Sequence, residues 1–600
     1  MKHTRTMGRR TGVGTLCTWI VEVGRLCTQP LSAPRALPQS EARQKGHFSR
    51  WWPGVILLLM LGAYFVTDAA LPLRGLYFYQ AIPITKFEDW LLWPTRWLFP
   101  QEAIIWSQHF IGAIPATPNV AMHETWLLFA CFILLFAFYL LALRVLPRHI
   151  HLRYLLWSTT LLGLLCAFNA AVMSQDVFSY IIYARMGIVY QLNPLTTLPS
   201  TIAHDPVYPF VYWDNQPSAY GPTWIVITYG LQWLASSWKG GSLLTAVLAL
   251  RLFGLAMHLT STWLIWLLSG SLQQASGRIA PYKRVLATLA FAWNPLLLIE
   301  AVLNVHNDAA ILVLVLLAIW YVQTRPGHTN LAWIAAIMLA LAACLKITML
   351  VLFPGLLIFL WVQRPRRFQP IVWSLLAYVG TLVLLYAPFW DHGAALHVFR
   401  VNPGMTRDIN GPYEFLTHLY ESLRGQRFLY PGPDLGSTLE QASHSGAMVL
   451  YVLIYAVVSW RFLRTRQPNA LFPFINWLAA IWLLYCLIGS PWLWPWYFIT
   501  FLGLFALIEA TDAYAPSLTR LFRLPLVVRL LSFALLGLYA FETWGPHMKY
   551  IAGLYSMEWM YVRGLWLCVV PLLALRVTTL QIKRGIEQAK RWMMVRKDAV

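Results

Sequence analysis

Residues 154–187 read YLLWSTTLLGLLCAFNAAVMSQDVFSYIIYARMG, in which an apolar run is followed directly by the charged residue Asp176. A helix needs about 20 mainly apolar residues to cross a bilayer. The run 154–173 is long and apolar enough, so it predicts a transmembrane helix that ends shortly before Asp176. The same pattern recurs at LNVHNDAAIL (303–312) and LAACLKITML (341–350). Polar residues that interrupt membrane segments are candidates for function.

The composition of the whole chain indicates a membrane protein with many spans. Of its 600 residues, 58% are hydrophobic and 12% are charged, whereas charged residues make up about a quarter of an ordinary globular domain. The net charge of +21 would also suit a nucleic-acid-binding protein, but the basic residues stand in short clusters between apolar runs, as the positive-inside rule describes. The seven cysteines show neither a disulfide framework nor the CxxC spacing of a metal site. We therefore expect an all-α, polytopic membrane protein.

The chain divides into a large apolar part and two basic tails. Residues 1–50 predict a disordered cytoplasmic tail, with a transit-like peptide as the alternative. No short apolar core with a small-residue cleavage site precedes the first apolar run, so we expect no cleaved signal peptide. Residues 51–580 predict a single transmembrane domain, and residues 581–600 predict a second basic cytoplasmic tail.

The apolar runs and their basic connectors predict about fourteen crossings of the cell membrane, with both termini in the cytoplasm. This count requires 222–237 to be a membrane-embedded or re-entrant helix, because the basic connector at 278–284 would otherwise lie outside. The long segments 69–125, 174–221 and 388–446 then lie on the outer face, whereas the cytoplasmic connectors are short. Because long loops are commonly functional, we expect the site on the extracytoplasmic face.

The same topology brings the polar interruptions together. On the outer face it places Asp176, His306, Asn307, Asp308, Lys346, Arg400, Arg407 and the PWLWPWY stretch at 491–497. A shared face predicts a single site built from segments far apart in the sequence.

Asp176 is the candidate general base in this group. A carboxylate at the membrane surface, partly shielded by protein, can have a raised proton affinity and accept a proton from a substrate. Helical spacing places Tyr180 one turn away. An N-cap role at the start of an interfacial helix is the alternative for Asp176. Asp68, at the outer end of the first span, is a rival acid with a helix-end charge as its simpler explanation.

The stretch WNPLLLIEAVLNVHNDAAILV (293–313) holds Glu300 within apolar sequence and His306, Asn307 and Asp308 at the junction of two spans. Ionisable groups in a membrane are unfavourable unless they are paired, so they are functional candidates by default. One histidine and one aspartate without spaced partners make a weak metal site. Hydrogen bonding to a sugar or phosphate is the favoured role, and a polar helix-breaking junction is the alternative.

Basic and aromatic residues on the same face suggest what is bound. Lys346 stands between two spans joined almost without a loop, where it could bind a phosphate or extend to lipid headgroups. Arg185, Arg400 and Arg407 suggest an anionic ligand, although Arg185 could equally contact lipid. The tryptophans of 491–497 could stack on sugar rings or form part of an interfacial aromatic belt.

Four motifs, in this order, carry a resemblance to a known family: SQDVFSYIIYARMGIVYQLNP (174–194), AYGPTW (219–224), FAWNPLLLIEAVLNVHNDAAILV (291–313) and ACLKITMLVLFP (343–354). Together they resemble the polyprenol-phosphate-mannose-dependent mannosyltransferases of the GT-C superfamily, and most closely the bacterial alpha-1,6-mannosyltransferases of lipoglycan synthesis. The likeness spans about residues 155–365 in motifs and the rest only in hydropathy.

The resemblance implies a GT-C scaffold with juxtamembrane helices and a lipid-phosphate sugar donor used on the outer face. Asp176 matches the loop aspartate that deprotonates the acceptor hydroxyl in such enzymes. The HND sequence at 306–308 matches the family's HND, and Lys346 matches its lysine after a helix. One feature departs from the family pattern. Two spans precede the span that leads into Asp176, whereas the catalytic acidic residue follows the first span in many members of the superfamily. Asp68, which stands at the outer end of the first span here, therefore stays a candidate. The residues expected to bind substrate are Tyr180, Arg185, Asn193, Tyr220, His306, Asn307, Asp308, Lys346, Arg400, Arg407, Trp494 and Trp496.

These observations predict an integral membrane glycosyltransferase. It would move a hexose, expected to be mannose, from a polyprenyl-phosphate-sugar donor to a glycan or glycolipid acceptor. Because the donor already carries a good leaving group, the reaction needs one base and cations for the phosphate, not the two carboxylates of a glycosidase. Membrane lipids are the only other partners expected, with no nucleic acid and no cofactor, and the dependence on a metal is left open. A lipid-linked sugar flippase or other membrane transporter is the alternative, and it would need charged groups along a path between both faces.

Overall fold

The computed structural model of the chain is built almost entirely from helices. It describes residues 51–73, 76–77, 91–100, 118–237, 242–324, 332–363, 367–399, 438–465, 470–490, 492–514, 523–541 and 566–574, with isolated residues between 410 and 423. Within these residues the only paired strands are β1 (Leu76–Tyr77) and β2 (Ala171–Val172), which are antiparallel. The described residues confirm the expected all-α class. The predicted tails at 1–50 and 581–600 lie outside them.

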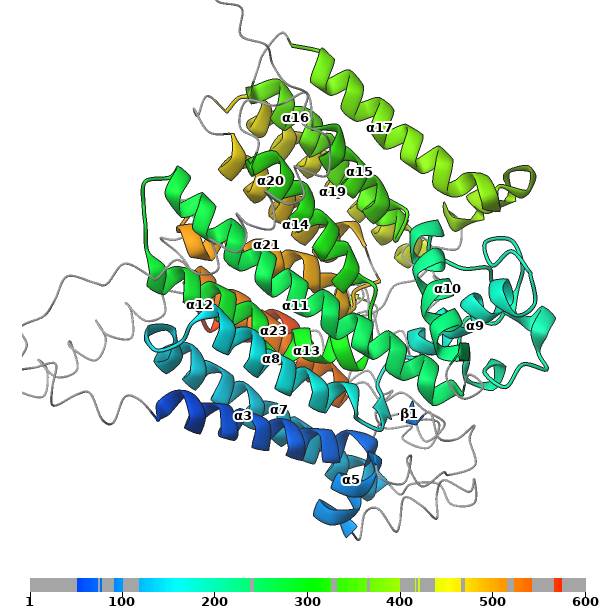
Figure 1. The fold of residues 1–600 in the computed structure, drawn as a ribbon, viewed down its shortest axis with the longest axis vertical. Helices are drawn as coiled ribbons and strands as arrows, with labels where there is room; N and C mark the ends of the chain where they lie inside the picture. The colour runs from blue at the N-terminus through cyan, green and yellow to red at the C-terminus, as the bar shows by residue number, and fades with distance from the viewer. Residues whose placement is uncertain are drawn as a thin grey trace, which may run out of the picture.

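Three early helices form one side of the bundle. They are α3 (Trp52–Ala70), α7 (Pro118–Val145) and α8 (Leu152–Ala167), which Figure 1 draws side by side in blue and cyan. Pro53 stands in the first turn of α3, where its fixed φ angle favours the helix and its missing N–H is not needed. The short helix α5 (Trp93–Leu98) packs against α3.

The helix α11 (Leu243–Ala275) crosses the centre of the molecule (Figure 1). Ser242 caps it, because its side chain accepts a hydrogen bond from the Thr245 N–H. α11 packs against α8 on one side and against α14 (Asp308–Thr324) and α21 (Phe498–Thr511) on others. This position makes α11 the common neighbour of the segments that lead into the candidate site.

A broken helix leads into the HND sequence. α12 (Pro281–Ala292) and the following helical segment, which starts with α13 (Pro295–Leu298), meet at an angle of 47°. The chain continues in one π-helical turn, η7 (Ile299–Leu303), and Val305 then has a φ of 58°. A β-branched residue rarely adopts a positive φ. The π turn and Val305 thus interrupt the helix before residues 306 and 307, and α14 begins at Asp308.

Most of the remaining helices cover the other side of the bundle (Figure 1), whereas α23 packs against α7. They are α15 (Trp333–Ala343), η9 (Ile347–Leu352), α16 (Phe353–Gln363), α17 (Gln369–Tyr386), η10 (Ala387–Phe389), η11 (Asp391–Phe399), α19 (Thr438–Leu463), α20 (Leu471–Leu484), η13 (Tyr485–Gly489), η14 (Pro495–Tyr497) and α23 (Leu524–Phe541). One apolar core joins most of them to α3, α7, α8 and α11, whereas Ala395 of η11 packs in a small separate cluster with Leu195 and Ile225.

One end of the bundle carries two further helices that pack against each other. α9 (Asp176–Ile188) and α10 (Pro222–Ser237) lie together at the right of Figure 1, joined by a loop with the short helices η5 (Pro199–Ile202) and η6 (Tyr208–Phe210). α10 is the stretch predicted to be embedded or re-entrant, and it is not among the described helices that are long and apolar enough to cross a bilayer.

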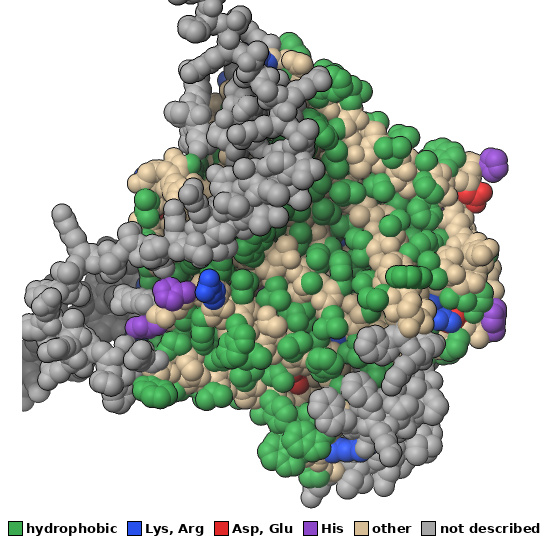
Figure 2. Space-filling view, in the orientation of Figure 1, with side chains coloured by type: hydrophobic (Ala, Val, Ile, Leu, Met, Phe, Trp, Pro, Cys, Tyr) green, Lys and Arg blue, Asp and Glu red, His purple; other side chains and the backbone are tan. Residues whose placement is uncertain are grey.

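Six described helices are long and apolar enough to cross a membrane, or seven if the broken pair at α12 counts as one span. Six shorter apolar helices of 10–17 residues accompany them. The expected number of about fourteen crossings therefore stays a prediction. Some of these helices turn apolar side chains outward: only 22% of the apolar window in α17 and 11% in α19 is buried. Figure 2 shows hydrophobic side chains spread over much of one face of the molecule.

Candidate active site

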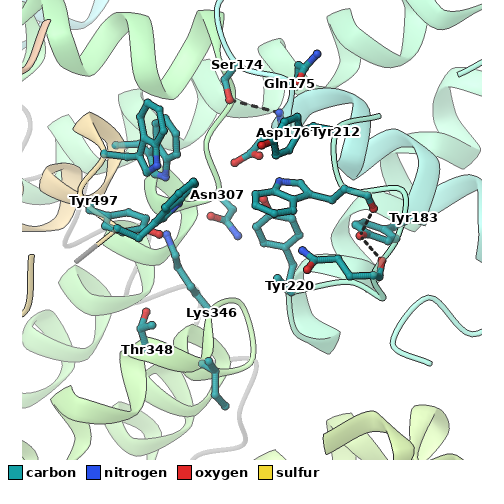
Figure 3. Close-up of a pocket in the computed structure, with 17 residues that line it drawn as sticks. Ser174, Gln175, Asp176, Tyr183, Tyr212, Tyr220, Asn307, Lys346, Thr348 and Tyr497 are labelled. Atoms are coloured by element: carbon teal, nitrogen blue, oxygen red, sulfur yellow. Dashed lines mark hydrogen bonds between the residues drawn. The ribbon is translucent and has the colours of Figure 1, made fainter. Parts of the chain in front are cut away.

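A cavity of about 850 Å³, part of it open to solvent, lies where α9 and its following loop meet the ends of the bundle helices. Figure 3 shows Asp176, Tyr220, Asn307 and Lys346 around this space. Its other lining residues are Ser174, Gln175, Tyr183, Tyr212, Trp213, Gln216, Ala219, Ile347, Thr348, Trp492, Trp494, Trp496 and Tyr497. The cavity thus collects polar residues from several segments that are distant in sequence.

Asp176 is the first residue of α9, and its side chain is 16% exposed. Gln175 occupies the N-cap position, with no side-chain cap hydrogen bond, so Asp176 is not the N-cap. The backbone N–H of Asp176 donates a hydrogen bond to Ser174 Oγ at 3.3 Å. Burial raises the pKa of the Asp176 carboxyl, while a hydrogen bond with Tyr220 and the charge of Lys346 act in the opposite direction. A carboxyl with a raised pKa that faces a cavity can accept a proton from a bound hydroxyl.

His306 lies between two carboxyl groups. Its Nδ1 is 3.6 Å from Asp176 Oδ2, and its Nε2 is 3.4 Å from Glu300 Oε2. Glu300 is fully buried and belongs to the π turn that precedes the HND sequence. Burial lowers the pKa of His306 well below its usual value, so the ring is neutral at physiological pH. The sequence marks Glu300 as an ionisable residue in an apolar run, but it gives no reason to expect Glu300 beside His306.

Lys346 and Asp308 form an ion pair at the cavity wall. Lys346 Nζ lies 3.2 Å and 3.1 Å from the two carboxylate oxygens of Asp308, and it also stands 3.8 Å from the centre of the Tyr497 ring. Asp308 is fully buried, whereas the Lys346 side chain is 13% exposed and lines the cavity. The alternative in which Lys346 extends to lipid headgroups does not describe this arrangement, since its ammonium group is bound within the protein.

A wall of aromatic rings closes one side of the cavity. The Trp496 ring stacks on His306 with centroids 3.8 Å apart, and Trp494 stacks on Trp496 at 4.9 Å. Trp494 is 1% exposed and Trp496 is 7% exposed, so both rings are enclosed by protein. An interfacial belt would place them at the lipid surface. The π-helical segment η13 precedes this aromatic stretch, as η7 precedes the HND sequence.

Some predicted binding residues have structural partners instead of lining the cavity. Arg185 forms an ion pair with Asp205 at 2.7 Å, and Tyr190 donates to the same carboxylate. Asn193 donates from Nδ2 to the Phe389 carbonyl at 3.0 Å. These contacts hold the loop after α9 in place. A substrate role for Arg185 and Asn193 stays a prediction.

The other predictions fall into three groups. Tyr180 is buried behind Tyr220, with their ring centroids 4.9 Å apart, so it supports the cavity wall without being one of its lining residues. Arg400 and Arg407 lie outside the described residues. Asp68 is buried in α3 and does not line the cavity, and its carbonyl accepts a hydrogen bond from Asn169.

Several lining residues were not among the sequence predictions. Tyr183, Tyr212, Trp213, Gln216 and Thr348 line the cavity together with Tyr497. The aromatic pair at 212–213, only a few residues before the AYGPTW motif, was the available signal for the loop residues. No group of three or more metal-binding side chains occurs among the described residues.

The chain is a glycosyltransferase, and comparison with known families gives this class. Residues 95–363 match the family model for alpha-(1->6)-mannopyranosyltransferase, N-terminal domain, which confirms the mannosyltransferase resemblance. The matched segment contains Asp176, the HND sequence and Lys346, and it ends before the aromatic stretch at 492–497. A search of curated proteins found no match.

Proposed function

We propose that this protein transfers a mannosyl group from a polyprenyl-phosphate donor to a hydroxyl of a glycan or glycolipid, on the extracytoplasmic face of the membrane. The observation that carries the proposal is the cavity in which a carboxyl with raised proton affinity, Asp176, faces the same space as the Lys346 ammonium group. These are the two kinds of group that the reaction requires.

Asp176 serves as the general base in this reaction. The acceptor oxygen forms a bond to the anomeric carbon of the donor sugar while the bond between that carbon and the phosphate oxygen breaks. The acceptor's proton passes to the Asp176 carboxylate, and the electron pair of the broken bond stays on the leaving polyprenyl phosphate. A single direct displacement inverts the anomeric carbon. The neighbouring His306, neutral and packed on Trp496, helps to hold the carboxyl in position.

Lys346 binds the donor phosphate in this proposal. Its ammonium group has three N–H donors, and its two closest contacts are to the oxygens of Asp308. Another donor is available to an oxygen of the phosphate at the cavity surface. A charge-assisted bond there becomes stronger as negative charge develops on the leaving group. Asn307 can add a neutral donor, because its buried Nδ2 has no hydrogen-bond partner among the described residues.

The aromatic wall binds the sugar. Sugar rings have apolar C–H faces, and stacked indole rings offer flat apolar surfaces of matching size. Trp494 and Trp496 of this wall line the cavity together with Trp213 and Trp492, and these rings can contact a hexose while Asp176 meets the acceptor. The polyprenyl tail stays in the bilayer, since each buried CH₂ group contributes about 0.8 kcal/mol to membrane anchoring.

The orientation rests on the distribution of charges and loops. The basic connectors follow the positive-inside rule when the opposite end of the bundle faces the cytoplasm. α9, α10 and the loop between them then lie outside, together with the cavity. A donor carried in the outer leaflet reaches this cavity without crossing the membrane.

The direct test is transfer by membranes that contain the protein. These membranes are incubated with radiolabelled polyprenyl-phosphate-mannose, with radiolabelled nucleotide-mannose as a parallel donor, and the glycan products are separated. We expect label from the polyprenyl donor to enter glycan with the wild type and not with Asp176→Asn. Transfer from the nucleotide donor alone would overturn the proposed donor class.

A further inference from the structure

Arg251, in the middle of α11, is a completely buried arginine whose guanidinium bonds to two separate segments of backbone. Its Nε donates to the Leu303 carbonyl at 3.0 Å. Its Nη1 donates to the carbonyls of Ala167, at 3.2 Å, and Asn169. Its Nη2 donates to the Ala171 carbonyl. A guanidinium has five N–H donors in a rigid planar fork, so it can bridge partners that a lysine cannot reach together.

The two bonded segments are those that carry the candidate catalytic groups. The carbonyls at 167–171 belong to the end of α8 and the connector that continues to Asp176. Leu303 ends the π turn and stands three residues before His306. The two segments are more than a hundred residues apart in sequence, and in the described structure a single side chain links their backbones.

A second position on the same face of α11 shows how closely this helix approaches the π turn. Gly254 is one turn after Arg251, and a Cβ added there would lie 2.0 Å from the Ala301 carbonyl oxygen. No real Cβ contacts a backbone oxygen at that distance, so any larger residue would force α11 and the π turn apart. Gly254 permits the close approach, and Arg251 fixes it with hydrogen bonds.

We propose that Arg251 is a positioning residue, which sets the separation between Asp176 and His306 by holding both backbone segments on one guanidinium. This inference rests on the proposed function, in which Asp176 is the base. A misplacement of about 1 Å can lower a rate by about 10²-fold even when it arises away from the reacting atoms. The proposal therefore requires the shape of the guanidinium as well as its charge.

The test compares Arg251→Lys with Arg284→Lys in the full-length membrane protein. Arg284 is a matched control, because its Nε also donates to a backbone carbonyl of α11, that of Trp266, at 2.8 Å. It also packs over the Trp266 ring, away from the cavity lining. We expect Arg251→Lys to lower kcat about 10²-fold with little change in the KM for the polyprenyl-phosphate donor. We expect Arg284→Lys to keep the kcat of the wild type.

A second pair of variants covers the case in which Arg251→Lys does not reach the membrane. Gly254→Ala introduces the clash with the Ala301 carbonyl, whereas for Gly270→Ala, on the same helix, the nearest atoms belong to the Arg284 side chain and not to the backbone. We expect Gly254→Ala to lower kcat and Gly270→Ala to leave it unchanged. Equal losses of activity and melting temperature in both arginine variants and both glycine variants would overturn the positioning role and leave a structural one.

The failure of this inference differs from failure of the proposed function. If Asp176→Asn is inactive while well-expressed Arg251→Lys has the wild-type kcat, the base assignment stands and Arg251 does not position it. If Asp176→Asn is fully active, the base assignment fails, and the positioning role assigned to Arg251 fails with it.

Discussion

His306 Nδ1 lies 3.6 Å from Asp176 Oδ2, so the HND sequence and the start of α9 meet at one imidazole ring. On its other side, the same ring faces the buried Glu300. Because burial keeps the ring neutral, one of its nitrogens carries a proton and the other does not. The ring therefore stands between a carboxyl at the cavity and a carboxyl inside the bundle, and neither of its nitrogens has a hydrogen-bond partner among the described residues.

The first prediction concerns the base. Asp176→Asn should lower the transfer rate by about 10²–10⁴-fold, the usual contribution of a general base. Burial raises the pKa of this carboxyl in the folded protein, so ionising it is unfavourable and its contribution to stability falls as pH rises through that pKa. The asparagine variant should therefore be at least as stable as the wild type at neutral pH. Radiolabel transfer and thermal unfolding in detergent measure the two effects, and a fully active variant would refute the assignment.

A second prediction concerns the pH dependence of transfer. Activity should rise with pH as Asp176 loses its proton, and the rise should occur above the range of an ordinary aspartate, because its pKa is raised. Tyr220→Phe removes a hydrogen bond that lowers this pKa, so its profile should move to still higher pH. Tyr183→Phe is the control, since Tyr183 donates to the carbonyl of Gln216. An unchanged Tyr220→Phe profile would show that Asp176 is not the titrating group.

Lys346 gives a third prediction, about the donor. Lys346→Gln should raise the KM for the polyprenyl-phosphate donor more than that for the acceptor, because a charged contact to phosphate is lost. This change also leaves Asp308 unpaired, and breaking a buried ion pair can cost about 3–5 kcal/mol. The double variant Lys346→Gln with Asp308→Asn removes both charges and should recover expression without recovering donor affinity. Normal donor affinity in the double variant would contradict a phosphate role.

The fourth prediction tests the aromatic wall. Trp496→Leu should weaken sugar binding and loosen His306, because the indole ring stacks on the imidazole at 3.8 Å. Stacked aromatic pairs contribute about 0.5–1.5 kcal/mol beyond their buried area, which corresponds to a loss of up to about tenfold in affinity. Trp233→Leu on α10 is the control, because Trp233 is 64% exposed. Equal kinetic constants for the two variants would show that the aromatic wall does not bind the sugar.

The fifth prediction concerns orientation. In a variant without native cysteines, Leu198→Cys lies in the loop after α9, and Ile279→Cys lies in the connector between α11 and α12. Both native side chains are exposed. We expect an impermeant maleimide to label position 198 in intact cells and position 279 only after permeabilisation. The reverse pattern would place the cavity on the cytoplasmic face.

The sequence alone was sufficient to predict that the main polar residues lie close together. Asp176, residues 306–308 and Lys346 each follow an apolar run, and runs of similar length end at the same height in a bundle. The structure places these residues around one space or directly beside it. Their chemical roles remain predictions, because arrangement alone does not establish a reaction.

Other features depend on tertiary contacts that no local pattern encodes. From its expected position on the outer face of the membrane, Arg185 was a candidate for binding an anion. In the structure it pairs with Asp205 in the loop that follows α9. Glu300 lies beside His306 where a π turn and the positive φ of Val305 interrupt the helix, whereas regular helical spacing would not predict this pair. Arg251 stands in an ordinary apolar helix in the sequence, and only the fold shows which carbonyls it bonds.

The ion pair between Lys346 and Asp308 also bears on turnover. In the proposed function, an unpaired lysine at this position would hold the donor phosphate tightly, and the spent carrier would leave slowly. Because Asp308 lies beside Lys346, an arriving phosphate would displace part of an existing contact, and that contact would form again when the phosphate departs. We therefore expect the Asp308 carboxylate to limit how strongly the carrier binds before and after transfer alike, and to favour release of the lipid product back into the bilayer.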